Sequence, residues 1–172
     1  MKHIVSIRSL SMLLAVLALC AGTLRAEEEA KPSIQDAFGA TLINAQGEEV
    51  DTASLAGKKI GLYFSAQWCP PCRAFTPVLV QTYNELKEQG KPFELIFVSS
   101  DRSEEAMFKY MADYGMNWLA LPFGDARRAA LRSKHGVRGI PTLIIVDENG
   151  QTLSANGTAE VSAHGAAAFD NW

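Results

Sequence analysis

The chain has 172 residues, of which 48% are hydrophobic and 20% charged, as is typical of a globular protein. This length suffices for one domain with a full-sized core and is marginal for two. The formal net charge is −3 and no long basic run occurs, so the composition argues against a nucleic-acid-binding protein.

The first 26 residues are predicted to be a signal peptide rather than part of the fold. Lys2 and Arg8 provide a positive start, and the apolar stretch Leu10–Ala21 has the length of a signal-peptide core but is too short to span a bilayer well. Cleavage after Ala26 would export the mature chain to the periplasm or the extracellular space. An uncleaved membrane anchor and a lipoprotein modified at Cys20 are the alternatives.

The segment after the signal peptide is predicted to be polar and flexible over residues 27–38, followed by one domain over residues 39–172. Residues 40–51 hold two short β-type runs around Gln46-Gly47, which predicts a β-hairpin. Residues 59–65 form an apolar, aromatic-rich run that is typical of a buried central strand.

The remainder of the chain is predicted to alternate helices and strands, which favours a single α/β domain. The pair Arg127-Arg128 falls on one of these helices and is interpreted as part of a solvated face. The expected elements are a helix from Pro71 ended by Gly90, a strand at 93–99, a helix capped by Asp101 or Ser103, a helix at 125–134, a strand at 143–146, an antiparallel return at 151–153 and a last helix at 158–169.

Two cysteines, Cys69 and Cys72, lie between the predicted central strand and the N-terminus of the following helix. Free N–H groups and the helix dipole at that position stabilise negative charge and therefore favour a thiolate at Cys69. A thiolate is the attacking species in disulfide exchange. The pair closes too small a loop to stabilise a fold appreciably, so it is better interpreted as reactive than as structural.

The residues around the two cysteines support this chemistry. Cys72 lies one helical turn further on and can resolve a mixed disulfide on Cys69. Trp68 would shield the nucleophile and offer an apolar docking surface. Pro70 and Pro71 suit the first helical positions. Arg73 either supports a thiolate electrostatically or is a surface residue without a role in the site. Half of a zinc site is the alternative for a C-x-x-C pair, but the further ligands are lacking and neither a metal nor a cofactor is expected.

Pro141 provides the second signal, because Ile140-Pro141 follows a glycine-containing loop and precedes a strand. A simple edge turn is the ordinary interpretation of such a proline. In a chain with a redox motif, a cis Ile140–Pro141 bond would instead turn the chain next to the cysteines. It would expose the backbone of Ile140 for pairing with an extended substrate.

At Trp68-Cys69-Pro70-Pro71-Cys72-Arg73 the chain resembles the thioredoxin superfamily, and more narrowly its tryparedoxin and nucleoredoxin branch. Phe75-Thr76-Pro77, Val98-Ser99-Ser100-Asp101 and Gly139-Ile140-Pro141-Thr142-Leu143 extend the resemblance over about residues 40–172. The resemblance implies an α/β thioredoxin fold, with a central mixed sheet flanked by helices and preceded by the hairpin. It also implies a nucleophilic Cys69, a resolving Cys72 and a cis-proline at Pro141.

One departure from ordinary thioredoxin concerns the buried acid that lies six residues before the first cysteine there. This position is Tyr63 here, which leaves the proton acceptor for Cys72 unassigned. The resemblance predicts an enzyme that exchanges protein disulfides, but it does not carry over the family's physiological partners. A monomer that receives electrons from an upstream thiol donor is expected. A non-catalytic thioredoxin-fold interaction module and a dedicated reductant in cytochrome maturation are the alternatives.

Overall fold

The computed structural model describes residues 33–172, and the predicted signal peptide lies outside the described residues. The elements of this part are α1 (Ile34–Phe38), β1 (Thr41–Ile43), β2 (Glu49–Asp51), the 3-10 helix η1 (Thr52–Leu55), β3 (Lys59–Ser65), α2 (Pro70–Glu88), β4 (Phe93–Ser99), α3 (Glu104–Tyr114), β5 (Leu119–Ala120), α4 (Arg127–Lys134), β6 (Thr142–Val146), β7 (Thr152–Ser154), α5 (Gly157–His164) and the 3-10 helix η2 (Gly165–Asn171).

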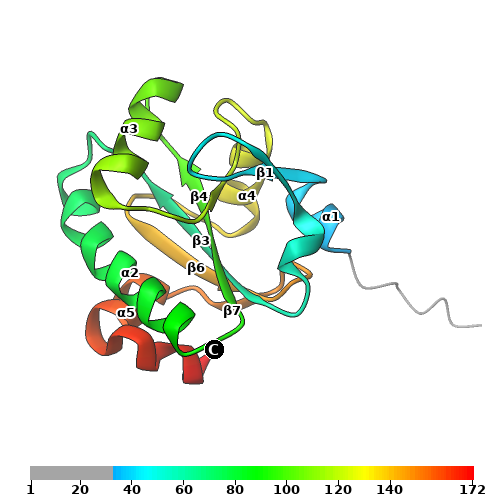
Figure 1. The fold of residues 1–172 in the computed structure, drawn as a ribbon, viewed down its shortest axis with the longest axis vertical. Coiled ribbons are helices and arrows are strands. Elements are labelled where there is room, and N and C mark those ends of the chain that lie inside the picture. Colours follow the sequence, from blue (N-terminus) through cyan, green and yellow to red (C-terminus); the bar gives the residue numbers. More distant parts are fainter. Residues whose placement is uncertain (1–32) are drawn as a thin grey trace, which may run out of the picture. The chain divides into compact units, whose positions relative to one another are not determined.

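The strands of this part form one mixed sheet in the order β2-β1-β5-β4-β3-β6-β7. Figure 1 labels β1, β4, β3, β6 and β7 of this sheet. Strand β3 lies near the middle, pairing parallel with β4 and antiparallel with β6. The hairpin β1-β2 joins the sheet through β5, as an antiparallel extension. This arrangement confirms the predicted mixed α/β sheet with its N-terminal hairpin. It also places the C-terminal ends of β3 and β4 side by side, so the cysteine segment that follows β3 and the segment Ser100-Asp101 that follows β4 leave the sheet at the same edge.

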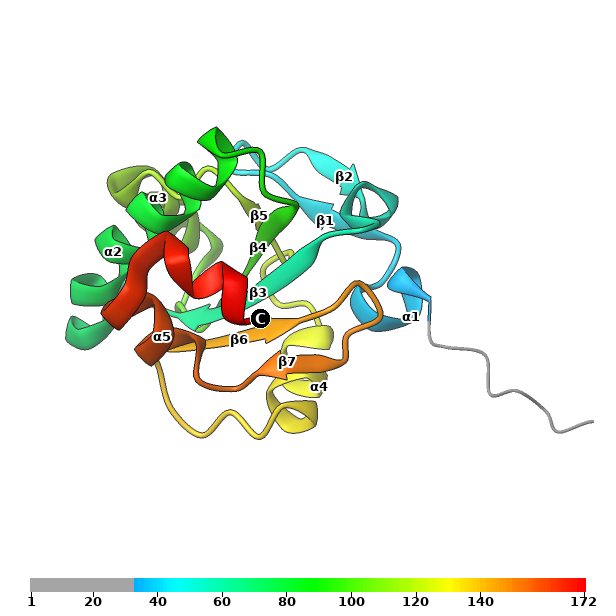
Figure 2. The ribbon, with the colours of Figure 1, turned by 90° about the horizontal axis from the view of Figure 1, so that it is seen from below.

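Helices cover both faces of the sheet, since side chains along a strand point alternately to opposite faces. On one face, α2, α3, α5 and η2 pack over Tyr63, Phe97 and Ile145. On the other face, α1, η1 and α4 pack over Leu62 and Ile144. Figure 2 shows α4 on the opposite side of β6 and β7 from α2. Because both faces are covered, the central strands β3 and β4 are mostly apolar in sequence.

The predicted lead-in at residues 27–38 differs from the structure over its last part. Residues 34–38 form α1, whose N-terminus carries a capping box in which Asp36 N donates to Ser33 Oγ at 3.2 Å and Ser33 N donates to Asp36 Oδ2 at 2.8 Å. Phe38 is 1% exposed and packs in the α1-α4 face of the core. These residues are therefore an ordered part of the domain. No helix within residues 33–172 combines the length and the apolar character that a membrane crossing requires.

Contrary to the prediction, the side chain of Arg127 does not lie on a solvated face but is hydrogen-bonded within the domain. Its guanidinium donates to the carbonyl oxygens of Phe38 and Thr41, the latter at 3.0 Å, and pairs with Asp125. It thereby connects the start of α4 to the α1-β1 corner. The hydrogen bond from Arg127 lowers the pKa of Asp125 below its ordinary value.

Replacement of this guanidinium by an amide, in Arg127→Gln, is expected to lower the free energy of unfolding by about 2–4 kcal/mol, because hydrogen bonds to a charged group contribute roughly 1.5–3 kcal/mol each. Urea unfolding monitored by circular dichroism measures this difference. The lowered pKa of Asp125 gives stability that is present above the unfolded value of about 3.9 and is lost as pH falls through the folded pKa. The difference between the two proteins should therefore shrink in acid.

The control for this experiment is Lys109→Gln, which removes one positive charge from an exposed pair with Asp113 on α3. It should cost less than about 1 kcal/mol. Equal losses in the two variants would show that Arg127 contributes only a surface charge.

Candidate active site

Cys69 and Cys72 lie at the N-terminus of α2 and form a disulfide with a Cα–Cα distance of 5.2 Å. Cys69 is the N-cap residue and is 4% exposed, whereas Cys72 lies inside the first turn and is fully buried. Pro70 and Pro71 occupy the first two helical positions, where an N–H group would have no intrahelical acceptor. Cys69 is thus the sulfur nearer the surface, and it lies where the helix dipole favours a thiolate once the disulfide is reduced.

The Ile140–Pro141 peptide bond is cis, as the family resemblance implied, and its loop lies against the disulfide. The carbonyl oxygen of Ile140 is 3.7 Å from Cys69 Sγ, and the Ile140 side chain packs on a small cluster of Ala66 and the two cysteines. Pro141 leads directly into β6, next to β3 in the sheet. Two segments 71 residues apart therefore form one site around Cys69.

The segment before Cys69 is attached to the end of β4. Trp68 is 50% exposed, and its indole Nε1 donates to the carbonyl of Ser100 at 3.0 Å. Arg73 donates to the carbonyl of Gln67 at 3.1 Å. Arg73 therefore contacts the backbone of the active-site segment, while Trp68, which precedes Cys69, stays half-exposed with the guanidinium of Arg102 6.0 Å from its ring centroid.

Asp101 is a site residue that sequence reasoning treated only as a possible helix cap. Its carboxylate accepts Gln67 N and Ser99 Oγ, each at 2.8 Å, and the residue is 5% exposed. Ser103, not Asp101, caps α3. The signal available in the sequence was an acid placed two residues after the end of a buried strand, β4, which runs parallel to the strand preceding Cys69.

Beneath Cys72 lies a buried cluster of hydroxyl groups. Thr76 Oγ1 donates to the carbonyl of Cys72 at 2.8 Å and lies 2.7 Å from Tyr63 Oη and 2.5 Å from Tyr110 Oη. Ser65 Oγ donates to Tyr63 Oη at 3.0 Å. Burial raises the pKa of Tyr63 far above its ordinary value. The phenol at the position of thioredoxin's buried acid therefore stays protonated and is not a proton acceptor for Cys72; its hydrogen-bond partners are the hydroxyl groups of Thr76 and Ser65.

Within residues 33–172, no group of three or more His, Cys, Asp or Glu side chains is arranged to hold a metal ion. The cysteine pair instead caps a helix at the end of a central strand and faces a cis-proline loop. This fold and this site define the class of thioredoxin-fold thiol–disulfide oxidoreductases. The sequence also matches the profile of the thioredoxin-like family over residues 57–152, and the chain belongs to that family.

Three known proteins illustrate the similarity. Human nucleoredoxin is 45% identical over 128 residues, which cover 74% of this chain and 29% of nucleoredoxin. A thioredoxin from Wuchereria bancrofti has 40% identity and a TM-score of 0.69 over 74% of this chain and 88% of that one. Tryparedoxin I from Crithidia fasciculata has 37% identity and a TM-score of 0.70 over 78% of this chain and 94% of that one. The similarity to nucleoredoxins and tryparedoxins indicates thiol–disulfide oxidoreductase activity.

The chain spans less than a third of the length of the curated nucleoredoxins that it matches. These relatives also correct one prediction, because nucleoredoxins are intracellular proteins. The expectation of export to the periplasm or the extracellular space is wrong on this comparison. The apolar N-terminal stretch resembles a signal peptide in composition, and composition alone does not establish export.

Proposed function

We propose that the chain catalyses thiol–disulfide exchange on protein disulfides through the Cys69–Cys72 dithiol. The observation that supports this proposal most strongly is the position of Cys69 Sγ, at the N-terminus of α2 and 3.7 Å from the carbonyl of Ile140. One sulfur thus combines a thiolate-favouring helix end with a backbone segment able to pair with an extended substrate chain.

The reaction runs in two displacements. The Cys69 thiolate attacks a substrate disulfide, forming a mixed disulfide and releasing one substrate thiolate, which takes up a proton. Cys72, deprotonated, then attacks Cys69 Sγ, the Cys69–Cys72 bond forms, and the second substrate thiolate leaves and is protonated. Two electrons pass from the dithiol to the substrate. An upstream thiol donor returns them by the reverse sequence, which regenerates the reduced pair.

Other residues of the site bind and position rather than react. Trp68 and Ile140 border Cys69 and provide apolar surface to the substrate, while Pro141 shapes the loop that carries the Ile140 carbonyl. Asp101 fixes the backbone ahead of Trp68 through Gln67 N. Arg73 assists that positioning through the carbonyl of Gln67.

Reduction of insulin with dithiothreitol as the electron source tests this function. The protein should accelerate the appearance of reduced insulin chains, and Cys69→Ser should return the rate to that of dithiothreitol alone, because the attacking sulfur is removed. Val78→Ser, an exposed change on the same helix, is the matched control and should keep the wild-type rate. Acceleration that persists in Cys69→Ser would contradict the proposal.

A further inference from the structure

A pocket of 510 Å³ adjoins the active site on the side of Trp68 and Ile140. Three arginines line it: Arg128 and Arg132 on α4, and Arg138 in the loop that leads to Ile140-Pro141. Ile140 is also the residue whose carbonyl lies beside Cys69 Sγ, so the pocket and the reactive sulfur share Ile140 as a neighbour.

The three guanidinium groups retain donors for a ligand. Arg128 donates to the carbonyl of Ser99 at 3.3 Å and Arg132 to the carbonyl of Val137 at 3.4 Å, both at long distance. An arginine has five N–H donors, so most of them remain available. Among residues 33–172, none of the three arginines forms an ion pair with a carboxylate.

The one carboxylate that lines the pocket does not neutralise these arginines. Asp101 lines the pocket, but its Oδ1 accepts a hydrogen bond from Gln67 N and its Oδ2 accepts one from Ser99 Oγ, so both oxygens already have hydrogen-bond partners. Three positive charges thus face one buried negative charge in a chain whose formal net charge is −3. Arg128 and Arg132 are neighbours on the same helix face, where like charges repel unless an anion lies between them.

The geometry points to an acidic segment of a disulfide-bonded polypeptide as the occupant of this pocket. We propose that the three arginines bind Asp or Glu side chains close to the substrate cysteine, and this inference rests on the proposed function. Guanidinium groups match carboxylates through paired N–H donors. A substrate strand beside Ile140 would direct neighbouring side chains into the pocket, which makes these arginines determinants of substrate choice.

The test compares two disulfide-linked peptides with identical cysteines, one flanked by Asp and Glu and the other by Asn and Gln. The wild-type protein should reduce the acidic peptide with kcat/KM about tenfold higher, since two partly exposed ion pairs together contribute about this factor. The preference should decline between 20 and ~300 mM NaCl, because salt screens such contacts.

The double variant Arg132→Gln/Arg138→Gln should lower the ratio of the two kcat/KM values from about ten toward one, because only Arg128 of the three arginines remains. Its control is Lys109→Gln/Lys134→Gln, which removes the same charge from α3 and α4 at residues that do not line the pocket. The control should keep the tenfold ratio.

The outcomes separate the two proposals. Turnover of the neutral peptide without any preference for the acidic one overturns the inference and leaves the proposed function intact, whereas no turnover of either peptide overturns the function itself. Inorganic phosphate is the probe for a small anion. Phosphate is compared with chloride at the same ionic strength. If phosphate inhibits the reduction of both peptides equally, and the protein reduces the two peptides at the same rate, the pocket is assigned to a small anion and the inference is overturned.

Discussion

Cys72→Ser protein is expected to accumulate stable mixed disulfides with its substrates, and every one of them should be joined through Cys69. The reason is the order of the two sulfurs along α2. Cys69 caps the helix next to the Ile140 loop, whereas Cys72 is fully buried behind it and can reach only a disulfide already formed on Cys69. A serine at position 72 leaves that intermediate without its resolving thiolate.

Non-reducing electrophoresis followed by mass spectrometry of the linked peptides measures this trapping. Cys69→Ser is the matched control, because it retains one cysteine of the pair in the same turn of the helix and should trap nothing above background. Equal trapping in the two variants would show that the roles of nucleophile and resolving thiol are not divided as proposed.

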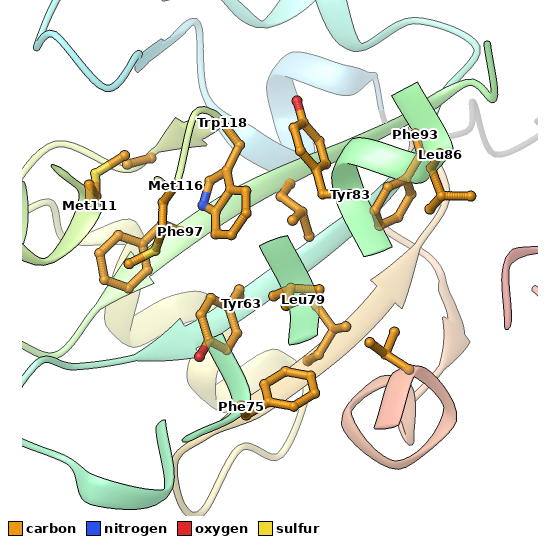
Figure 3. Packing of buried hydrophobic residues seen from close by; sticks show 14 of the residues in the cluster. Tyr63, Phe75, Leu79, Tyr83, Leu86, Phe93, Phe97, Met111, Met116 and Trp118 are labelled. Carbon is orange, nitrogen blue, oxygen red and sulfur yellow. The ribbon is translucent and has the colours of Figure 1, made fainter. Parts of the chain in front are cut away.

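Tyr63→Asp is expected to cause a large loss of stability. Tyr63 is fully buried, with its ring centroid 5.9 Å from that of Phe75 and 6.4 Å from that of Trp118 (Figure 3). Removing a large buried aromatic side chain costs about 3–5 kcal/mol, and an unpaired buried carboxylate adds to that loss.

The loss in Tyr63→Asp should depend on pH in a defined sense. Burial would raise the pKa of the new carboxyl above its unfolded value of about 3.9. The loss should be smallest below about pH 4, where the group is neutral in both states, and should grow as pH rises toward the folded pKa. Urea unfolding between pH 3 and ~8 measures this dependence.

Tyr63→Phe is the control, since it keeps the ring and removes only the hydroxyl bonded to Thr76 and Ser65. It should cost about 1–2 kcal/mol with little pH dependence between pH 4 and ~8. A carboxyl at position 63 should also add an inflection to the pH profile of substrate release from Cys69. A destabilised Tyr63→Asp protein with an unaltered release profile would show that this position serves the fold alone.

The central strands were predictable from sequence to the residue, and the reason is their burial on both faces. Residues 59–65 and 93–99 are mostly apolar because helices cover both sides of β3 and β4, and polar residues occur only at or next to the strand ends, at Lys59, Ser65, Glu94 and Ser99. By contrast, β5 spans two residues and α1 spans five, which is too short for a periodic pattern to develop.

The cysteine pair and the cis-proline of the candidate site were also predictable. Cys69 and Cys72 lie three residues apart in sequence, and a cis peptide bond is expected almost only before a proline. The residues that hold it in place were not. Asp101 contacts Gln67 across 34 positions, and Tyr110 reaches Thr76 across the same number. Arg127 and Arg128 are adjacent and look alike in sequence, yet one secures α1 and β1 while the other lines the pocket beside Cys69. Their roles depend on which element packs against each one.

The most direct test of the central claim is stoichiometric exchange in the absence of any other thiol. Fully reduced protein is mixed with a disulfide-linked peptide, acid-quenched over time and analysed by intact and peptide mass. We expect one Cys69–Cys72 disulfide to appear for each substrate disulfide lost, with two free substrate thiols released. Substrate reduction without formation of the Cys69–Cys72 bond, or no exchange at all, would contradict the account.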